Sequence, residues 1–288
     1  MNDFILNNEQ TIRLGAFLGI FALIALWELA SPRRQQSLSR LQRWSSNLGL
    51  VALNTLLLRL LFPAAAVGMA AFAGAQGWGL LNYLAWPFWL QLLLSLILLD
   101  LVIYLQHVMV HAVPALWRLH RVHHADLEYD LTTGARFHPI EIILSMLIKI
   151  TTIAALGPPV VAVVLFEVIL NGMAMFNHGN IELPGAVDRI LRRLIVTPDM
   201  HRVHHSVEVD ETNSNFGFNL SLWDRLMGTY REQPRQGQLG MQIGIDSLRD
   251  PRITNRLDGM LRIPFIRTQD HYAINQHDWS DKPREGDT

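Results

Sequence analysis

The chain has 288 residues, of which 50% are hydrophobic and 17% are charged, and its formal net charge is −1. Soluble domains carry about 25% charged residues, so this chain is unusually apolar, and its near-neutral charge gives no reason to expect nucleic acid as a partner. Its length allows one large domain or two small ones. The chain contains no cysteine, which excludes disulfides, thiolate metal sites and a cysteine nucleophile.

Three apolar runs predict membrane helices at residues 11–30, 48–75 and 85–106, because about 20 apolar residues are enough to cross a bilayer. A secretory signal peptide is the alternative reading of the first run. However, Asp3 and Glu9 stand where a signal peptide carries basic residues, and no small-residue cleavage site follows. We therefore expect a retained helix.

The loops between these runs predict their orientation. Four arginines and no acidic residue lie within residues 33–43, whereas the turn at 75–84 carries no charge. Basic loops favour the cytoplasmic side of a membrane. The third helix should therefore deliver His107 to the cytoplasmic face, which we expect to be that of a bacterial inner membrane.

The fourth apolar run, at residues 142–174, is interrupted by Gly157, Pro158 and Pro159. Proline lacks an amide donor and restricts the residue before it, so this sequence breaks a helix. A single crossing would place the histidines downstream on the opposite side from those upstream. We therefore expect a hairpin that turns at Gly157, with arms of roughly 16 residues that are near the lower limit for a full crossing.

Histidines dominate the middle of the chain, where ten of the twelve lie between residues 107 and 205. Five of them fall within residues 107–124, and the motif HRVHH in that stretch recurs at 201–205. On a helix, His107 and His111 share one face, and the spacing within HRVHH also lets its rings converge. The candidate metal ligands are His107, His111, His120, His123, His124, His138, His178, His201, His204 and His205.

This set of nine or ten imidazoles is too large for one metal and predicts two ions. Imidazole suits iron, zinc, copper and nickel, so the ligand type does not identify the metal. His138 and His178 stand at the two ends of the apolar hairpin. A lone histidine in either position is more often a surface or hydrogen-bonding residue than a ligand, but the neighbouring clusters favour ligation.

Asp100 lies within the third apolar run, seven residues before His107 and on the same helical stripe. A carboxylate in a bilayer segment is costly and indicates a function. We expect Asp100 to accept the free ring N–H of a ligand histidine. Helix packing is the alternative role for this residue.

The motifs HVMVH, HRVHH, RFHPIE, NHGN and TPDMHRVHHS, followed by NSNFGFNLSLWDRLMGTY, resemble the fatty acid hydroxylase superfamily, also called the sterol desaturase family. The resemblance runs from about residue 100 to residue 230. It implies a non-haem di-iron enzyme of the membrane that uses O₂ to hydroxylate or desaturate a lipid. It also implies that the histidines named above, with His138 the least secure, bind the two iron ions, and that the WDRLMGTY block packs over them.

Some members of that family carry a further histidine where this chain has Ala174, so His138 or a water would complete the coordination there. The resemblance leaves sterols, ether lipids and acyl chains open as substrates. Since no haem, flavin or ferredoxin module is evident in the chain, we expect a separate redox partner of the ferredoxin, cytochrome or pterin type.

Two other classes of function remain open. A zinc-dependent membrane hydrolase needs a carboxylate base among its ligands, and neither histidine cluster contains a glutamate. A membrane metal-binding or transport protein needs ionisable residues along several crossing helices, whereas these histidines lie at the membrane edge.

The expected fold is all-α: a multi-pass membrane helical bundle with a cytoplasmic, histidine-rich helical cap that holds a di-metal site. Residues 1–106 should form the N-terminal transmembrane helices. Residues 107–262 should form the histidine-rich catalytic region, with a membrane hairpin at 142–174. Residues 263–288 should form a polar C-terminal tail, and the whole should act as a single functional domain.

Overall fold

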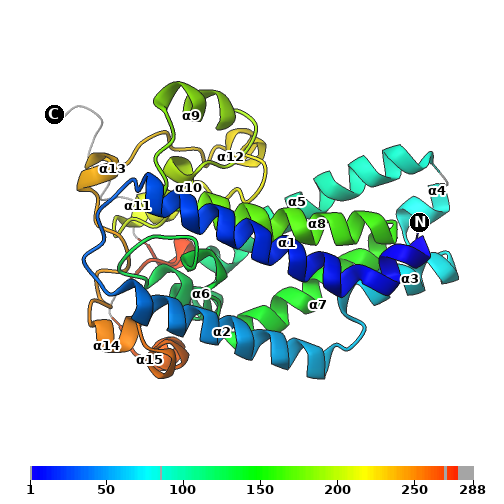
Figure 1. Cartoon of the computed structure of the whole chain (residues 1–288), viewed down its shortest axis with the longest axis horizontal. Helices are drawn as coiled ribbons and strands as arrows, with labels where there is room; N and C mark the ends of the chain where they lie inside the picture. Colours follow the sequence, from blue (N-terminus) through cyan, green and yellow to red (C-terminus); the bar gives the residue numbers. More distant parts are fainter. Residues whose placement is uncertain (1, 85, 269–270, 278–288) are drawn as a thin grey trace.

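The structure is a computed structural model that describes residues 2–84, 86–268 and 271–277. Long helices run side by side along the molecule, and short helices gather at one end of them (Figure 1). The long helices are α1 (Asn2–Ala30), α2 (Arg40–Leu61), α5 (Phe88–Ala112), α7 (Pro139–Leu156) and α8 (Val160–Asn177). We call this set the bundle.

The end of the bundle that carries the short helices is called the cap, and it comprises the described residues 113–138 and those after residue 177. Its elements are α6 (Pro114–His124), η1 (Thr133–Ala135), α9 (Gly185–Leu191), α10 (Pro198–His204), α11 (Val209–Thr212), α12 (Leu222–Met227), α13 (Gly237–Gly240), α14 (Pro251–Thr254), α15 (Leu257–Arg262), η2 (Ile263–Phe265) and η3 (Ile274–Gln276). Extended pairing in the described residues is limited to isolated bridges. The predicted all-α class is confirmed.

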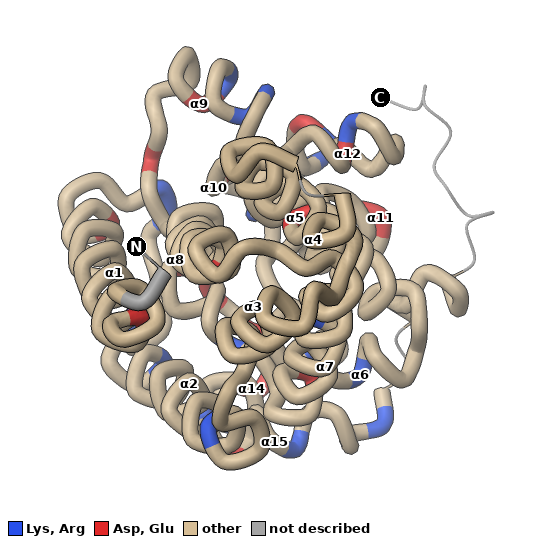
Figure 2. Tube along the Cα trace, turned by 90° about the vertical axis from the view of Figure 1, so that its right-hand side faces the viewer, with Lys and Arg blue, Asp and Glu red and all other residues tan. Residues whose placement is uncertain are grey.

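The predicted membrane helices are also confirmed by length and composition. Five helical stretches of the described chain are long and apolar enough to cross a membrane: Phe4–Ala30, Arg40–Leu84, Phe88–Ala112, Pro139–Leu156 and Val160–Asn177. Viewed from the end opposite the cap, α3 (Ala65–Gln76) and α4 (Leu80–Leu84) show no charged residues (Figure 2). Trp78, Trp86 and Trp89 are exposed at this end, as aromatic residues are at bilayer interfaces.

The second apolar run differs from its prediction, because it forms two helices and not one. Helix α2 ends at Leu61, and the Phe62 N–H closes it on the Leu58 carbonyl. Pro63 follows and has no N–H to continue the helix. The chain resumes as α3, which packs against α7 and α8.

The predicted hairpin is present as α7 and α8, joined at Gly157 with φ +66°. Only glycine adopts this left-handed conformation without strain. The turn also lies against Gly79, where an added Cβ would stand 2.2 Å from the Gly157 nitrogen. Backbone contact between these two glycines therefore closes the end of the bundle opposite the cap.

A buried ion cluster joins three helices inside the bundle. Glu167 on α8 is 3% exposed, accepts a hydrogen bond from Lys149 Nζ of α7 at 3.0 Å and forms an ion pair with Arg13 Nη1 of α1 at 3.3 Å. An isolated charge in a bilayer segment is costly. These three charges offset that cost by pairing with one another, and they connect α1 to the hairpin.

A second buried cluster attaches the cap to the bundle. Arg43 of α2 donates from Nε and Nη2 to both carboxylate oxygens of Asp126, at 3.0 and 2.8 Å, and from Nη1 to Asp130 at 2.5 Å. All three side chains are fully buried. Burial would raise the pKa of Asp126, but Arg43 and Arg136 together lower it to about 2. The carboxylate is therefore ionised and paired.

The basic loop at residues 33–43, which predicted a cytoplasmic orientation, is largely engaged within the protein. Arg33 pairs with Glu182 and Asp199 at 3.1 Å each. Arg34 donates from its guanidinium to the carbonyls of Gln238 and Met241. These arginines hold the cap, and the side of the membrane on which the cap lies stays a prediction.

A polar C-terminal tail is predicted at residues 263–288, and its described residues 271–277 pack on the cap. Tyr272 is 3% exposed, and Ala273 is buried beside it in the cluster that contains Trp117 and Ile263. The aromatic ring of Tyr272 provides the apolar surface for this contact. Residues 269–270 and 278–288 of the predicted tail lie outside the described residues.

The buried Arg43 cluster yields a stability prediction. Substituting Arg43→Met leaves the carboxylates of Asp126 and Asp130 without their main partner, so the free energy of unfolding should fall by about 3–5 kcal/mol. Thermal denaturation of the protein in detergent measures this. Arg59→Met, on the exposed face of the same helix, is the matched control and should change little. Equal stability of the two variants would contradict the prediction.

Candidate metal centre

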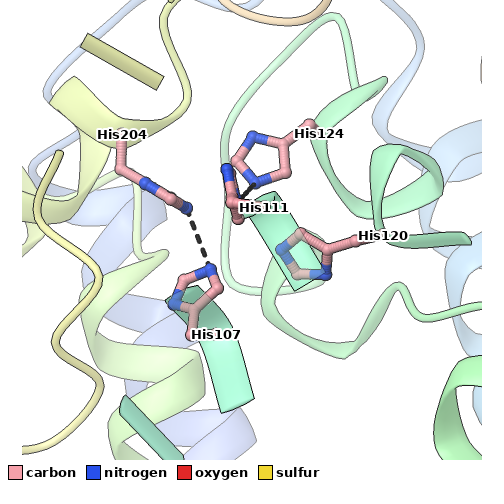
Figure 3. A group of neighbouring side chains, drawn as sticks. All are labelled: His107, His111, His120, His124 and His204. Atoms are coloured by element: carbon pink, nitrogen blue, oxygen red, sulfur yellow. Dashed lines mark hydrogen bonds between the residues drawn. The ribbon is translucent and has the colours of Figure 1, made fainter. Parts of the chain in front are cut away.

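Nine of the ten candidate histidines converge in two neighbouring groups where the cap meets the end of α5. Site A consists of His107, His111, His120, His124 and His204 (Figure 3). Site B consists of His123, His178, His201 and His205. Within each group one ligand atom per residue lies within 4.8 Å of the others, and every member is buried.

Helical spacing explains how each HRVHH motif serves both sites. On α6, His120 and His124 are four residues apart and face site A, whereas His123 faces site B. At α10 the order is reversed, because His201 and His205 face site B and His204 faces site A. Residues four apart share a helix face, so each motif places two rings in one site and one ring in the other.

The inner nitrogens of each site lie close together, at distances that suit either a hydrogen bond or a shared metal ion. In site A, Nε2 of His204 lies 3.0 Å from Nε2 of His107, and Nε2 of His111 lies 3.1 Å from that of His124 (Figure 3). In site B, Nε2 of His178 lies 3.2 Å from Nε2 of His123 and of His201. Imidazole nitrogens bind metals at about 2.0–2.1 Å, so two ligands at right angles lie about 3 Å apart. The spacing fits a metal.

The outer nitrogens of several rings are held by hydrogen bonds that fix the tautomer. Nδ1 of His107 lies 2.8 Å from the Phe216 carbonyl, and Nδ1 of His204 lies 2.7 Å from the Ser214 carbonyl. A carbonyl only accepts, so the proton sits on Nδ1 and the Nε2 lone pair is free. This arrangement is the usual one for metal-binding histidines.

The pKa values in the cap keep the rings neutral, as metal ligands must be. Burial, opposed by the hydrogen bond to the Ala174 carbonyl, lowers the pKa of His178 to about 3. Burial and the neighbouring His120 lower the pKa of His204 to about 3. Burial first, and adjacent rings second, lower the pKa of His123 and His205 well below the usual value.

Several buried ring nitrogens have no hydrogen-bond partner among the described residues. They include Nε2 of His120 and both nitrogens of His205. Buried polar atoms are normally satisfied, and each exception needs an explanation. Metal coordination supplies one here, so the donor set fits two metal ions.

His138, the tenth candidate, belongs to neither site, and its expected role as a ligand is corrected. Its Nδ1 accepts from the Ile140 N–H at 3.2 Å and caps the first turn of α7. The ring faces Phe265. His138 stands directly before Pro139, at the N-cap position of α7, where its side chain satisfies a backbone N–H of the first turn. Site B therefore keeps four histidines, with Ala174 contributing only its carbonyl to His178.

The expected role of Asp100 as the partner of a ligand histidine is also corrected, because the partners of its carboxylate are not histidines. It accepts from the Trp223 indole N–H at 2.9 Å and from the backbone N–H groups of Leu220 and Asn219 at 3.1 and 3.3 Å. Its carboxylate thus holds the segment before and within α12 against α5. The packing role that sequence reasoning kept as an alternative describes it better.

Glu141 is the carboxylate that contacts a candidate ligand, and sequence reasoning missed it. Its Oε1 lies 2.6 Å from Nδ1 of His120, and the side chain is 5% exposed. It lies in the first turn of α7, three residues after His138. The sequence signal was present in the motif RFHPIE, where an acidic residue enters an apolar run.

The ring that covers site A is Phe216, which precedes the WDRLMGTY block that was expected to pack there. The Phe216 ring lies 5.1–5.6 Å, centroid to centroid, from His107, His111 and His204. Asp224 accepts from the backbone N–H groups of Phe216 and Gly217 at 2.7 and 2.8 Å. Asp224 therefore fixes the loop whose aromatic ring shields the site.

The sequence of the chain is similar to those of known lipid-oxidising enzymes over the part that holds the histidines. Residues 92–229 match the family model described as fatty acid hydroxylase. The ornithine lipid hydroxylase OlsE of Rhizobium tropici is 30% identical over 151 residues, which are 52% of this chain and 44% of that protein. An alkylglycerol monooxygenase of Xenopus tropicalis is 29% identical over 150 residues, which are 50% of this chain and 30% of that protein.

A cholesterol 25-hydroxylase of Rattus norvegicus is 25% identical over 161 residues, which are 54% of this chain and 53% of that protein. The chain thus spans about half the length of these curated relatives or less. No solved structure matches significantly. The matched residues 92–229 include all nine histidines of sites A and B.

Metal content distinguishes the histidines of the two sites from His138. His123→Ala removes a ring from site B, so the purified variant should hold roughly one metal ion fewer per chain. His138→Ala removes only a helix cap and should keep the wild-type metal content. Elemental analysis of both proteins provides the measurement. Loss of metal from the His138 variant with a folded bundle would show that it is a ligand after all.

The two buried carboxylates should behave differently when substituted. Glu141→Leu removes the partner of His120 Nδ1 and should weaken metal binding at site A by roughly 10–100-fold. Asp100→Asn keeps the shape but weakens the contacts to α12, so it should lower thermal stability and leave metal affinity unchanged. Competition with a chelator measures affinity for both variants. If Asp100→Asn weakens metal binding as much as Glu141→Leu, the assigned roles are wrong.

Proposed function

Because the chain belongs to the fatty acid hydroxylase superfamily, we propose that it is an integral membrane oxidoreductase that oxidises a lipid with O₂ at two iron ions. The observation that carries the proposal is the convergence of nine buried histidines in two adjacent sites at one end of an apolar bundle. The reaction consumes a lipid C–H bond, O₂, two electrons and two protons. It yields an alcohol and one water, or an alkene and two waters when a second hydrogen is removed.

The residues of sites A and B would hold the iron ions. Imidazole also suits zinc, copper and nickel, and the names of the relatives favour a redox-active metal because they are hydroxylases and monooxygenases. When bound, two ferrous ions supply the activation of O₂ and the attack on an unactivated C–H bond. The protein supplies the geometry and the dry surroundings.

Aromatic side chains exclude water from both sites. Phe216 covers site A, and Phe137 stacks on His123 of site B with ring centroids 4.7 Å apart and an interplanar angle of 10°. A closed apolar setting prevents an oxidant from reacting with water or leaking protons. The rings thus direct the oxidation to a lipid that enters from the bundle.

The lipid would enter beside site A, where α5, α6 and α7 meet. A cavity of about 20 Å³ lies between α5, α6 and α7. Its lining is largely apolar and includes Glu141, the partner of His120. A volume of this size holds about one water molecule, so a lipid needs α5 and α7 to separate. Gln106 donates to Ser145 at 3.1 Å and joins the two helices at this point.

The substrate we propose is a membrane lipid, namely a sterol, an ether lipid or a lipid with an acyl chain. The relatives act, by their names, on ornithine lipids, alkylglycerols and cholesterol. We further propose that the cap faces the cytoplasm, where a separate redox partner supplies electrons. The arginine-rich loop at residues 33–43 supports that orientation.

Lipid mass spectrometry of a host that expresses the protein tests the proposal. Wild type, supplied with isotopically labelled O₂ and a reductase, should add one labelled oxygen atom to a class of lipids or remove two hydrogens from it. His204→Ala removes a ring from site A and should lower the product by at least roughly 100-fold, whereas His138→Ala should keep most of it. An unchanged lipid profile from an iron-loaded, reducible wild type would contradict the proposal.

A further inference from the structure

We propose that electrons enter site A through Tyr272 and Trp117, from a basic electron-transfer protein that docks at a pocket on the cap. This inference rests on the proposed function, because only a redox centre needs a supply of electrons. Neither Tyr272 nor Trp117 belongs to the two histidine sites. Tyr272 also lies outside residues 92–229, which match the family model.

The pocket lies on the exposed side of the cap and has a volume of about 550 Å³. Pockets of about 300–1,000 Å³ accommodate cofactor-sized groups. Its lining residues are Val207, Glu208, Val209, Gln242, Asp246, Ser247, His271 and Tyr272. Val207 comes two residues after His205 of site B, so one short segment contributes both to the pocket lining and to the histidine site.

Aromatic rings connect this pocket to site A without a gap. Tyr272 stacks on Trp117, with ring centroids 5.6 Å apart and an interplanar angle of 17°. Trp117 lies 4.8 Å from His111 and 5.2 Å from His124, centroid to centroid. Conjugated rings in contact carry an electron better than the same length of aliphatic side chain. The row of rings therefore leads from the pocket wall to two candidate ligands.

A hydrogen-bonded connection runs parallel to the rings. The Asn213 amide donates to the Tyr272 carbonyl at 2.8 Å, and its oxygen lies 3.1 Å from Nδ1 of His111. The Tyr272 hydroxyl donates to the Val207 carbonyl at 2.7 Å. These bonds hold the tyrosine ring in its stack and join it a second time to the same ligand.

Trp117 carries a feature that packing does not explain. Its indole N–H is buried and has no hydrogen-bond partner among the described residues. A buried donor without a partner is unfavourable, and phenylalanine would fill an apolar core without this penalty. A redox role is a recognised reason for such an exception. The indole ring provides the large conjugated surface that bridges Tyr272 and the histidines.

Charge identifies the kind of donor that fits the pocket. The lining contains the carboxylates of Glu208 and Asp246 and no lysine or arginine; Glu208 pairs with Arg235 outside the lining at 3.6 Å, whereas Asp246 is exposed. Opposite charges on two surfaces steer their encounter and raise the association rate. The matching partner is an electron-transfer protein that presents its redox group within a basic face.

The electron balance of the proposal is simple. Each passage oxidises the donor protein by one electron and reduces one ferric ion in the histidine sites to the ferrous state. No bond forms or breaks along Tyr272 and Trp117. Two passages, together with two protons from solvent, match the reduction of one oxygen atom of O₂ to water in the proposed reaction.

The absence of cysteine from the chain makes a direct test possible. A Gln242→Cys substitution places a single thiol at the pocket, and a ruthenium polypyridyl photoreductant attached there injects an electron after a laser flash. The rate of bleaching of the ferric absorbance, in the iron-loaded protein, measures transfer without lipid, O₂ or a natural donor. In this background, Tyr272→Leu should slow the transfer at least roughly tenfold.

Tyr272→Phe is the matched variant, because it keeps the ring on Trp117 and loses only the hydroxyl. It should transfer electrons at nearly the rate of the unsubstituted protein. Iron content and reduction by dithionite should be the same in both variants, which shows that the sites are intact. Equal rates for the Leu and Phe variants would overturn the route through Tyr272 and leave the proposed function standing.

A second arm tests the docking surface. Illuminated zinc-substituted cytochrome c, a basic protein and a strong one-electron reductant, serves as the donor. Asp246→Lys should slow its reduction of the iron sites roughly tenfold at low ionic strength and have no effect on reduction by dithionite. An unchanged rate would overturn the docking site. A wild-type centre that binds only zinc, or that dithionite cannot reduce, would overturn the proposed function as well.

Discussion

The structure depends on nine neutral imidazole rings that are buried around two points. His107 and His204 each hold their proton on Nδ1, so the lone pairs of their Nε2 atoms, 3.0 Å apart, repel one another unless a cation lies between them. Burial alone cannot stabilise such an arrangement. Metal binding at these sites would therefore stabilise the packing of the cap, and the rest of the fold serves to bring the rings together.

Three segments far apart in the sequence meet to build these sites. Helix α5 carries two rings out of the apolar bundle, α6 follows after a turn, and the hairpin of α7 and α8 returns the chain so that α10 lies beside α6. The buried pairing of Arg43 with Asp126 and Asp130 fastens the loop after α6 to α2. A polar cluster thus fixes the cap at the point where apolar packing with the bundle ends.

Local patterns in the sequence predicted the features that depend on local rules. The spacing of His107 and His111 predicted their common face, and Gly157 with the prolines after it predicted the hairpin. The partners of Asp100 and Glu141 depend on which helices meet in space. The spacing of residues along the sequence does not give that information. For the same reason His138 looked like a ligand and is a helix cap. Pro63 could have predicted the end of α2, but the residues on both sides of it are apolar, so a single helix was predicted.

The pairing of Lys149 with Glu167 bears on how the chain enters the bilayer during synthesis. Each charge alone opposes the insertion of its helix by about 2.5–3.5 kcal/mol near the bilayer centre. The two lie on opposite arms of the hairpin, 3.0 Å apart, and neutralise each other only when both arms are present. Insertion of the two arms together is therefore favoured over insertion of α7 alone, because Lys149 then enters the bilayer already paired with Glu167.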